Sequence, residues 1–203
     1  MLDKSALRAK MLEQRKMVNP IQRVSDAALL IAQFVMSVRL PIPMVIGGYW
    51  AVGSEMPAHD LLVHCQKAGH IIGLPTGNGD ASAPEAGRSM AFRQWFPDAD
   101  MHVGTFNVPE PDGVLVTPAL LLVPLLAFDA RGGRLGRGGG YYDQYVNDRR
   151  QSSDVCTLGL AFSSQEVENC PLEAHDARLD AIITPRDIHW VNKSAFTEIG
   201  MSV

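Results

Sequence analysis

The stretch that decides the fold is residues 119–143, which read ALLLVPLLAFDARGGRLGRGGGYYD. Its apolar run Ala119–Phe128 is far too short to span a bilayer and is interrupted by Pro124, so it predicts a buried strand and the turn after it. The glycines that follow lead into a helix expected from Gly138 to about Arg149. A buried strand, a glycine loop and a helix in succession are typical of an α/β fold.

Helices and strands are expected to alternate on both sides of this unit. The predicted helices are 3–18, 20–39 and 59–68, and the further predicted strands are 44–49, 71–74, 90–96, 156–162 and 181–184. Such alternation implies a mainly parallel sheet covered on both faces. The chain shows no internal repeat and no long linker, so residues 1–203 are expected to form a single domain.

Two local features make more detailed predictions. Asn19 and Pro20 suit the start of the second helix as its cap and first turn. We expect Pro75 to stop strand 71–74, and residues 76–88, rich in Gly, Ala, Ser and Pro, to form a loop near a site. The apolar face expected for helix 20–39 consists of Ile21, Val24, Ala28, Ile31, Val35 and Val38.

Composition narrows the class of protein. The chain has 203 residues, 46% of them hydrophobic, and a formal net charge of −4, which argues against general nucleic-acid binding. Cys65, Cys156 and Cys170 form no Cys-x-x-Cys pair, so we expect neither a disulfide framework nor a zinc site. The N-terminus has no signal-peptide pattern. These observations predict a cytoplasmic protein that binds neither membranes nor nucleic acids. We also expect the protein to be monomeric.

The glycine-rich run is the strongest chemical signal. Glycines let backbone amides approach an anion closely, and a helix start adds unpaired N–H groups and a positive dipole end. Arg134 and Arg137 add forked donors suited to phosphate oxygens, and Asp143 is placed to hold a magnesium ion. The Walker and dinucleotide-binding patterns both fail here, at Gly139 and Tyr141. The alternative is a flexible turn whose glycines serve only helix entry.

Weaker candidates lie elsewhere in the chain. Lys4 and Arg8 share one helix face, although their spacing alone favours a solvated face over a site. Glu55 follows a predicted strand and a Gly-Ser turn; its alternative role is negative charge before the next helix. The segment His175-Asp176 with Asp180 is a further candidate, in which His175 alone reads as a surface histidine.

Together these pieces resemble the 5-formyltetrahydrofolate cyclo-ligase family, also called methenyltetrahydrofolate synthetases. The resemblance is carried by Arg134–Asp143 and spans nearly the whole chain. It also includes Lys4-x-x-x-Arg8, Tyr49-Trp50 to Glu55, Pro124 to Asp129, and His175-Asp176-x-x-x-Asp180-x-Ile182-x-Thr184. Ala51 and Ala174 depart from it, since relatives often have proline there.

The resemblance implies a three-layer α/β/α fold and an ATP- and Mg²⁺-dependent closure of 5-formyltetrahydrofolate to 5,10-methenyltetrahydrofolate through phosphorylation of the formyl oxygen. The ATP-binding residues that it implies are Lys4, Ser5, Ala6, Leu7, Arg8, Arg134, Leu135, Gly136, Arg137, Gly138, Gly139, Gly140, Tyr141 and Tyr142. It gives Lys4 and Arg137 catalytic roles. It places the folate on Trp50, Glu55 and Tyr141, and the metal on Asp143 and Asp180.

Two other classes of protein remain as alternatives. One is a non-catalytic or isomerase-type α/β module for a phosphorylated small molecule, which would need the glycine loop and arginines but not Lys4, Glu55 and Asp143 together. The other is an RNA-binding protein, which the acidic total and the lack of a basic aromatic stripe disfavour.

Overall fold

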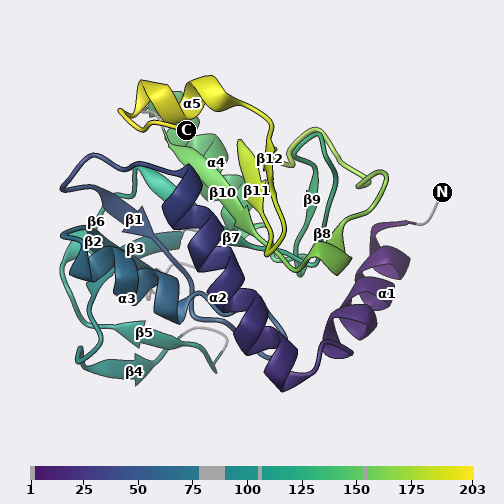
Figure 1. Cartoon of the computed structure of the whole chain (residues 1–203), viewed down its shortest axis with the longest axis horizontal. Coiled ribbons are helices and arrows are strands. Elements are labelled where there is room, and N and C mark those ends of the chain that lie inside the picture. The colour runs from purple at the N-terminus through teal and green to yellow at the C-terminus, as the bar shows by residue number, and fades with distance from the viewer. Residues whose placement is uncertain (1–2, 78–89, 105–106, 153–154) are drawn as a thin grey trace, which may run out of the picture.

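A large, mostly parallel sheet forms the centre of the molecule (Figure 1). The computed structural model describes residues 3–77, 90–104, 107–152 and 155–203. In spatial order the sheet consists of β12 (Ile188–Trp190), β11 (Ala181–Ile183), β10 (Cys156–Leu160), β7 (Leu120–Pro124), β1 (Val45–Gly47), β2 (Ile71–Gly77), β3 (Met90–Trp95) and β6 (Leu115–Val116). Strands β11, β10, β7, β1 and β2 pair in parallel, whereas β12, β3 and β6 are antiparallel at the edges. The apolar run of the decisive stretch is therefore a central strand.

Helices cover both faces of this sheet. Leu120 and Leu122 of β7 pack into the core shared with α2 (Pro20–Ser37), α3 (His59–Lys67) and α5 (Lys193–Glu198). Leu121 and Val123 point the other way, into the core shared with α4 (Tyr141–Ser152). This alternation, with period 2, confirms the three-layer arrangement.

The N-terminal helix α1 (Lys4–Lys16) packs beside the sheet rather than on it. It lies next to the hairpin β8 (Ala127–Phe128) and β9 (Arg134–Leu135), with Leu7 and Met11 in their shared core (Figure 1). A second small sheet joins β4 (Met101–Val103) and β5 (Pro109–Pro111). The caps follow the expected chemistry, since the Asn19 side chain accepts from the Gln22 amide at 2.8 Å with Pro20 in the first turn.

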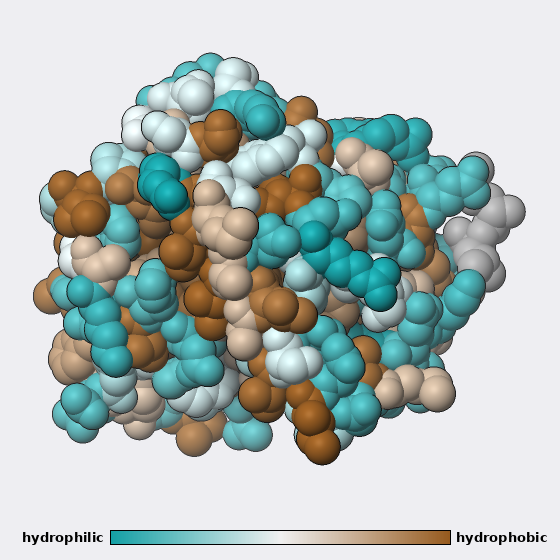
Figure 2. Space-filling view, viewed as in Figure 1, coloured by the Kyte–Doolittle hydropathy of each residue, from teal (hydrophilic) through white to brown (hydrophobic). Residues whose placement is uncertain are grey.

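The predicted apolar face of α2 is wrong at four of its six positions: only Val38 is buried and Ile31 packs against the core, whereas Ala28 and Val35 are exposed. The buried residues within the helix are Ala27, Leu30 and Phe34, while Ile21 and Val24 are exposed. Figure 2 shows apolar surface along the diagonal that α2 follows in Figure 1, interrupted by polar side chains. The helix has two apolar stripes, and the stripe that contains Phe34 packs against the core. Within the described residues, no helix is both long and apolar enough to cross a membrane.

Pro75 does not stop its strand, contrary to the prediction. Strand β2 continues to Gly77, with Pro75 opposite Phe92 of β3. On its other side β2 pairs with β1 only as far as Gly73, so a proline two residues later removes no hydrogen bond of that ladder. Of the predicted 76–88 loop, Thr76 and Gly77 belong to β2 and the rest lies outside the described residues.

Candidate active site

A cavity of about 950 Å³ opens where the parallel strands β1, β2 and β7 end. Tyr49 and Trp50 follow β1, Thr76 and Gly77 close β2, and Leu125 follows β7; all of them line the cavity. Ligands of α/β proteins commonly bind beyond the carboxyl ends of parallel strands, and the cavity has this position. The glycine loop and the first turn of α1 complete its wall.

The glycine loop forms the wall at the start of α4. Gly138 and Gly140 have φ of +100° and +73°, a region that side chains with a Cβ rarely adopt. Nε of Arg8 donates to the Gly136 carbonyl at 3.1 Å, so α1 supports this loop. The backbone amides at the start of α4 and the positive end of its dipole suit an anion. From Leu135 to Tyr142, every expected residue lines the cavity.

The first turn of α1 contributes only part of the expected set. Lys4, Ser5 and Arg8 line the cavity. Leu7 is buried against the β8–β9 hairpin, and the exposed Ala6 is not part of the lining. The side chains of Ala6 and Leu7 therefore do not face the cavity, because a helix presents only about one residue in four to a given side.

Lys4 is held by acidic residues from the far end of the sequence. Its Nζ lies 2.5 Å from Asp176 Oδ2 and 3.0 Å from Glu173 Oε1. Burial alone would lower the pKa of Lys4, but hydrogen bonds and charge from Asp176 and Glu173 outweigh it and raise that pKa. The ammonium group is therefore a fixed positive charge at the edge of the cavity.

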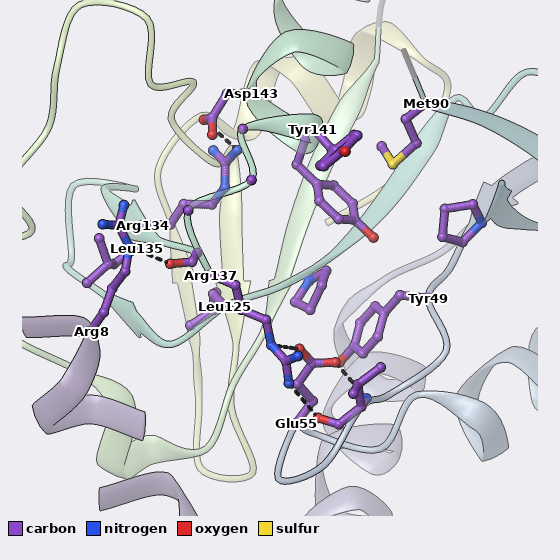
Figure 3. A pocket seen from close by; sticks show the side chains of 18 of the residues that line it. Arg8, Tyr49, Glu55, Met90, Leu125, Arg134, Leu135, Arg137, Tyr141 and Asp143 are labelled. Carbon is purple, nitrogen blue, oxygen red and sulfur yellow. Dashed lines mark hydrogen bonds and ion pairs between the residues drawn. The ribbon is translucent and has the colours of Figure 1, made fainter. Parts of the chain in front are cut away.

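Arg134 and Asp143 form an ion pair beside the loop (Figure 3). The Nη2 of Arg134 lies 2.7 Å from Asp143 Oδ1, its Nη1 donates to the Ala177 carbonyl, and the Ala177 amide donates to the same Oδ1 at 3.0 Å. Burial lowers the pKa of Arg134, and the charge of Asp143 opposes this. Oδ2 of Asp143 has no hydrogen-bond partner among the described residues and belongs to a carboxylate that lines the cavity, the kind of oxygen that Mg²⁺ prefers.

The expected metal role of Asp180 does not fit the structure. Asp180 is buried outside the cavity lining, and its Oδ2 accepts from the backbone and hydroxyl of Thr157 and from Arg150, at 2.7–2.9 Å. Its Oδ1 accepts from Asn192 at 3.3 Å. These contacts tie β10, α4 and the end of β12 together, so Asp180 has a structural role.

Glu55 and Arg137 meet across the cavity (Figure 3). Nε of Arg137 lies 3.1 Å from Oε1 of Glu55, and its Nη2 donates to the Val52 carbonyl at 2.9 Å. Oε2 of Glu55 accepts from the Val52 amide at 2.8 Å. Glu55 thus caps its own turn and does not cap α3, which begins at His59. Its side chain is 9% exposed and that of Arg137 is 52% exposed, so the carboxylate is fixed and the guanidinium is the movable partner.

Aromatic side chains line the same cavity as this carboxylate. Tyr49 is buried and donates to the Met56 carbonyl at 2.6 Å, and burial together with the charge of Glu55 raises its pKa well above the usual value. Trp50 remains 37% exposed, with its ring edge-on to His59. Tyr141 opens α4 on the cavity side. A flat heterocycle has a stacking surface here and a carboxylate beside it.

Sequence reasoning missed several cavity residues. Arg15 is buried in the wall, and Glu110 of β5 accepts from Thr76 Oγ1 at 2.5 Å and from the Gly77 amide at 3.2 Å. Asp176, whose role the sequence does not specify, lines the cavity and contacts Lys4. These residues reach the cavity through contacts between distant segments, for which a single sequence offers no signal.

Comparisons with known proteins identify the family of the chain. A family model described as the 5-formyltetrahydrofolate cyclo-ligase family matches residues 1–185. The 5-formyltetrahydrofolate cyclo-ligase of Haemophilus influenzae is 38% identical over 46% of this chain, and that match spans about half of the relative's length (53%). The Escherichia coli K12 protein of the same name is 30% identical over 66% of this chain and 74% of its own.

Solved structures extend the likeness to the fold. The 5,10-methenyltetrahydrofolate synthetase of Aquifex aeolicus superposes with a TM-score of 0.75 at 26% identity, over 93% of this chain and 92% of its own. The Mycoplasma pneumoniae synthetase, at 21% identity and a TM-score of 0.70 over 91% and 99% of the two chains, shares the fold. With a family match over residues 1–185 and the signature loop at the cavity, this chain belongs to the 5-formyltetrahydrofolate cyclo-ligase family.

Proposed function

We propose that the protein catalyses the ATP- and Mg²⁺-dependent cyclisation of 5-formyltetrahydrofolate to 5,10-methenyltetrahydrofolate, with release of ADP and phosphate. The observation that carries the proposal is that one cavity joins a cationic glycine loop to an aromatic wall with a carboxylate. A simple binder of phosphorylated molecules needs only the loop and its arginines. Here Lys4, Glu55 and Asp143 line the same cavity, which favours a two-substrate enzyme.

The chemistry requires an activated oxygen. The formyl oxygen is a poor leaving group, so it first takes the γ-phosphoryl group of ATP and ADP departs. A neighbouring folate nitrogen then attacks the activated carbon, and the C–O bond breaks as phosphate leaves and the ring closes. Phosphoryl transfer depends on positioning and charge neutralisation more than on a protein nucleophile.

The side chains divide this task between two halves of the cavity. Lys4, Arg8 and Arg137, with the amides before α4, would bind and orient the phosphates. Glu55 would accept hydrogen bonds from the amino and ring N–H groups of the pterin, and Trp50 and Tyr141 would stack on it. The exposed guanidinium of Arg137 is close enough to the boundary of the two halves to neutralise charge on the transferring group.

Asp143 is the carboxylate that would hold the magnesium ion. One or two carboxylates plus substrate phosphates are a common Mg²⁺ site, so a single carboxylate beside the loop fits. The bound ion would supply additional positive charge to the phosphates. The ion pair with Arg134 keeps this carboxylate in place.

The direct test mixes the purified protein with ATP, Mg²⁺ and 5-formyltetrahydrofolate and follows the absorbance of methenyltetrahydrofolate. We expect the absorbance to rise only with all three present, and ADP to appear only when the folate is added. ADP release that does not depend on the folate, without methenyltetrahydrofolate, would indicate another ATP-using reaction. Binding of ATP without turnover would favour a non-catalytic module.

A further inference from the structure

Arg15 is a buried cation in the cavity wall. Its side chain comes from the last turn of α1 and the residue is 1% exposed. Nε donates to the Ser54 hydroxyl at 3.1 Å and Nη1 donates to the Leu125 carbonyl at 2.9 Å. One side chain therefore ties three segments of the wall together: α1, the turn that carries Glu55, and the end of β7.

The third nitrogen of this guanidinium is unusual. Nη2 is buried and has no hydrogen-bond partner among the described residues. A buried charged donor without an acceptor is costly, so such a group calls for an explanation. Burial lowers the pKa of Arg15, and the charge of Glu55 is the largest influence that opposes it. The main compensating charge for Arg15 is therefore the carboxylate of Glu55.

Glu55 in turn has two cations near it. Arg137 contacts it directly at 3.1 Å but is half-exposed, whereas Arg15 is immobilised. The proposed function requires Arg137 at the ATP phosphates, which would take away the direct partner of Glu55. A nearly buried carboxylate without a counter-charge is unfavourable, so a second cation has to remain.

We propose that Arg15 is a positioning residue for the folate, which fixes the Glu55 turn and serves as the permanent counter-charge of that carboxylate when Arg137 turns to ATP. The proposal rests on the proposed function. It accounts for the orphan Nη2, which keeps a positive group without a neutral partner in the wall that carries Glu55. It also predicts that Arg15 matters most when nucleotide is bound.

The test is calorimetric binding of 5-formyltetrahydrofolate, with and without a non-hydrolysable ATP analogue, to the wild type and to Arg15→Met. With the analogue bound, we expect Arg15→Met to weaken folate binding about tenfold or more, and less without it. Affinity for the analogue should be unchanged. In the Glu55→Gln background, Arg15→Met should weaken folate binding by no more than about a further twofold.

Arg23 provides a matched control. It donates to the Gly53 carbonyl of the same turn at 3.3 Å but is not part of the cavity lining. Arg23→Met should change folate affinity by no more than about twofold. If Arg15→Met does not fold, Ser54→Ala, which removes the partner of Nε, should weaken folate binding selectively by a smaller factor, and Arg15→Lys should retain most of the affinity.

Several results would overturn the role of Arg15. The first is that Arg15→Met or Ser54→Ala binds folate with wild-type affinity. The second is that Arg15→Met weakens the binding of folate and of nucleotide equally, or weakens folate binding by the same factor with and without the analogue. The third is that the effects of Arg15→Met and Glu55→Gln on folate affinity are fully additive. A wild-type protein that binds no 5-formyltetrahydrofolate at all would instead remove the proposed function, and this role with it.

Discussion

Arg137 and Glu55, expected from the sequence to serve ATP and folate respectively, are bonded to each other at 3.1 Å. Figure 3 shows this contact beside the glycine loop, and in the proposed function it lies where the ATP and folate halves of the cavity meet. Under the proposed function each residue exchanges this protein partner for a substrate, so substitutions at the two positions should have different consequences.

Arg137→Ala should reduce turnover at saturating ATP by about 10²-fold or more, the scale for losing one preorganised charge donor. Its side chain is 52% exposed, so the melting temperature should barely change. Arg131→Ala is the control, because Arg131 lies in the preceding turn and outside the cavity lining. Near-normal turnover of Arg137→Ala would show that this guanidinium does not act on the transferring group.

Asp143→Asn should raise the magnesium concentration needed for half-maximal turnover, because the amide lacks the charge that attracts the ion. The same change weakens the pair with the buried Arg134, so we also expect a loss of about 1–3 kcal/mol of unfolding free energy. A magnesium titration and a denaturant titration separate the two effects. An unchanged magnesium titration would remove Asp143 as the ligand.

Asp129 gives a prediction on stability against pH. It is buried; burial alone would raise its pKa, but amides of Cys170, Arg131 and Gly133 lower it below the ordinary 3.8. A lowered pKa means that the folded state favours the ionised form, so its contribution is complete above pH 3.8 and is lost as pH falls through the folded-state value.

Asp129→Asn should therefore lower the free energy of unfolding by about 1–3 kcal/mol at neutral pH, and the difference from wild type should shrink as pH falls below 3.8. Urea titrations at pH 7, 5 and 3 measure this. Asp98→Asn, at an exposed position, is the control. A difference that stays constant across that range would mean that the carboxylate charge contributes nothing.

Patterns within one segment predicted much of the fold. The apolar run before the glycines became β7, and the cap at Asn19 and the start of α3 at His59 were also predicted. The prediction failed where the outcome depends on a distant partner. Helix α2 has two apolar stripes and only the sheet decides between them, and two-residue strands such as β6 carry no pattern of their own.

The same division applies to the site. The glycine loop lies at the cavity, as expected, because its chemistry is contained in consecutive residues. Arg15 and Glu110 were missed because each reaches the cavity through partners 34 or more residues away. Asp180 was misjudged for the related reason that its partners Arg150 and Thr157 approach it only in the folded chain.

Glu55→Gln should weaken binding of 5-formyltetrahydrofolate about 5- to 150-fold, since pterin donors would lose a charged acceptor worth about 1–3 kcal/mol. The melting temperature should hardly move, because a glutamine oxygen can still accept from the Val52 amide. Calorimetric titrations with folate and with an ATP analogue, beside a thermal melt, separate these quantities, and Glu168→Gln on the exposed surface is the control. ATP affinity should be unchanged or slightly higher, because Arg137 no longer has to leave an ion pair to reach the phosphates. Unchanged folate affinity together with a lower melting temperature would leave Glu55 with a purely structural role in its turn.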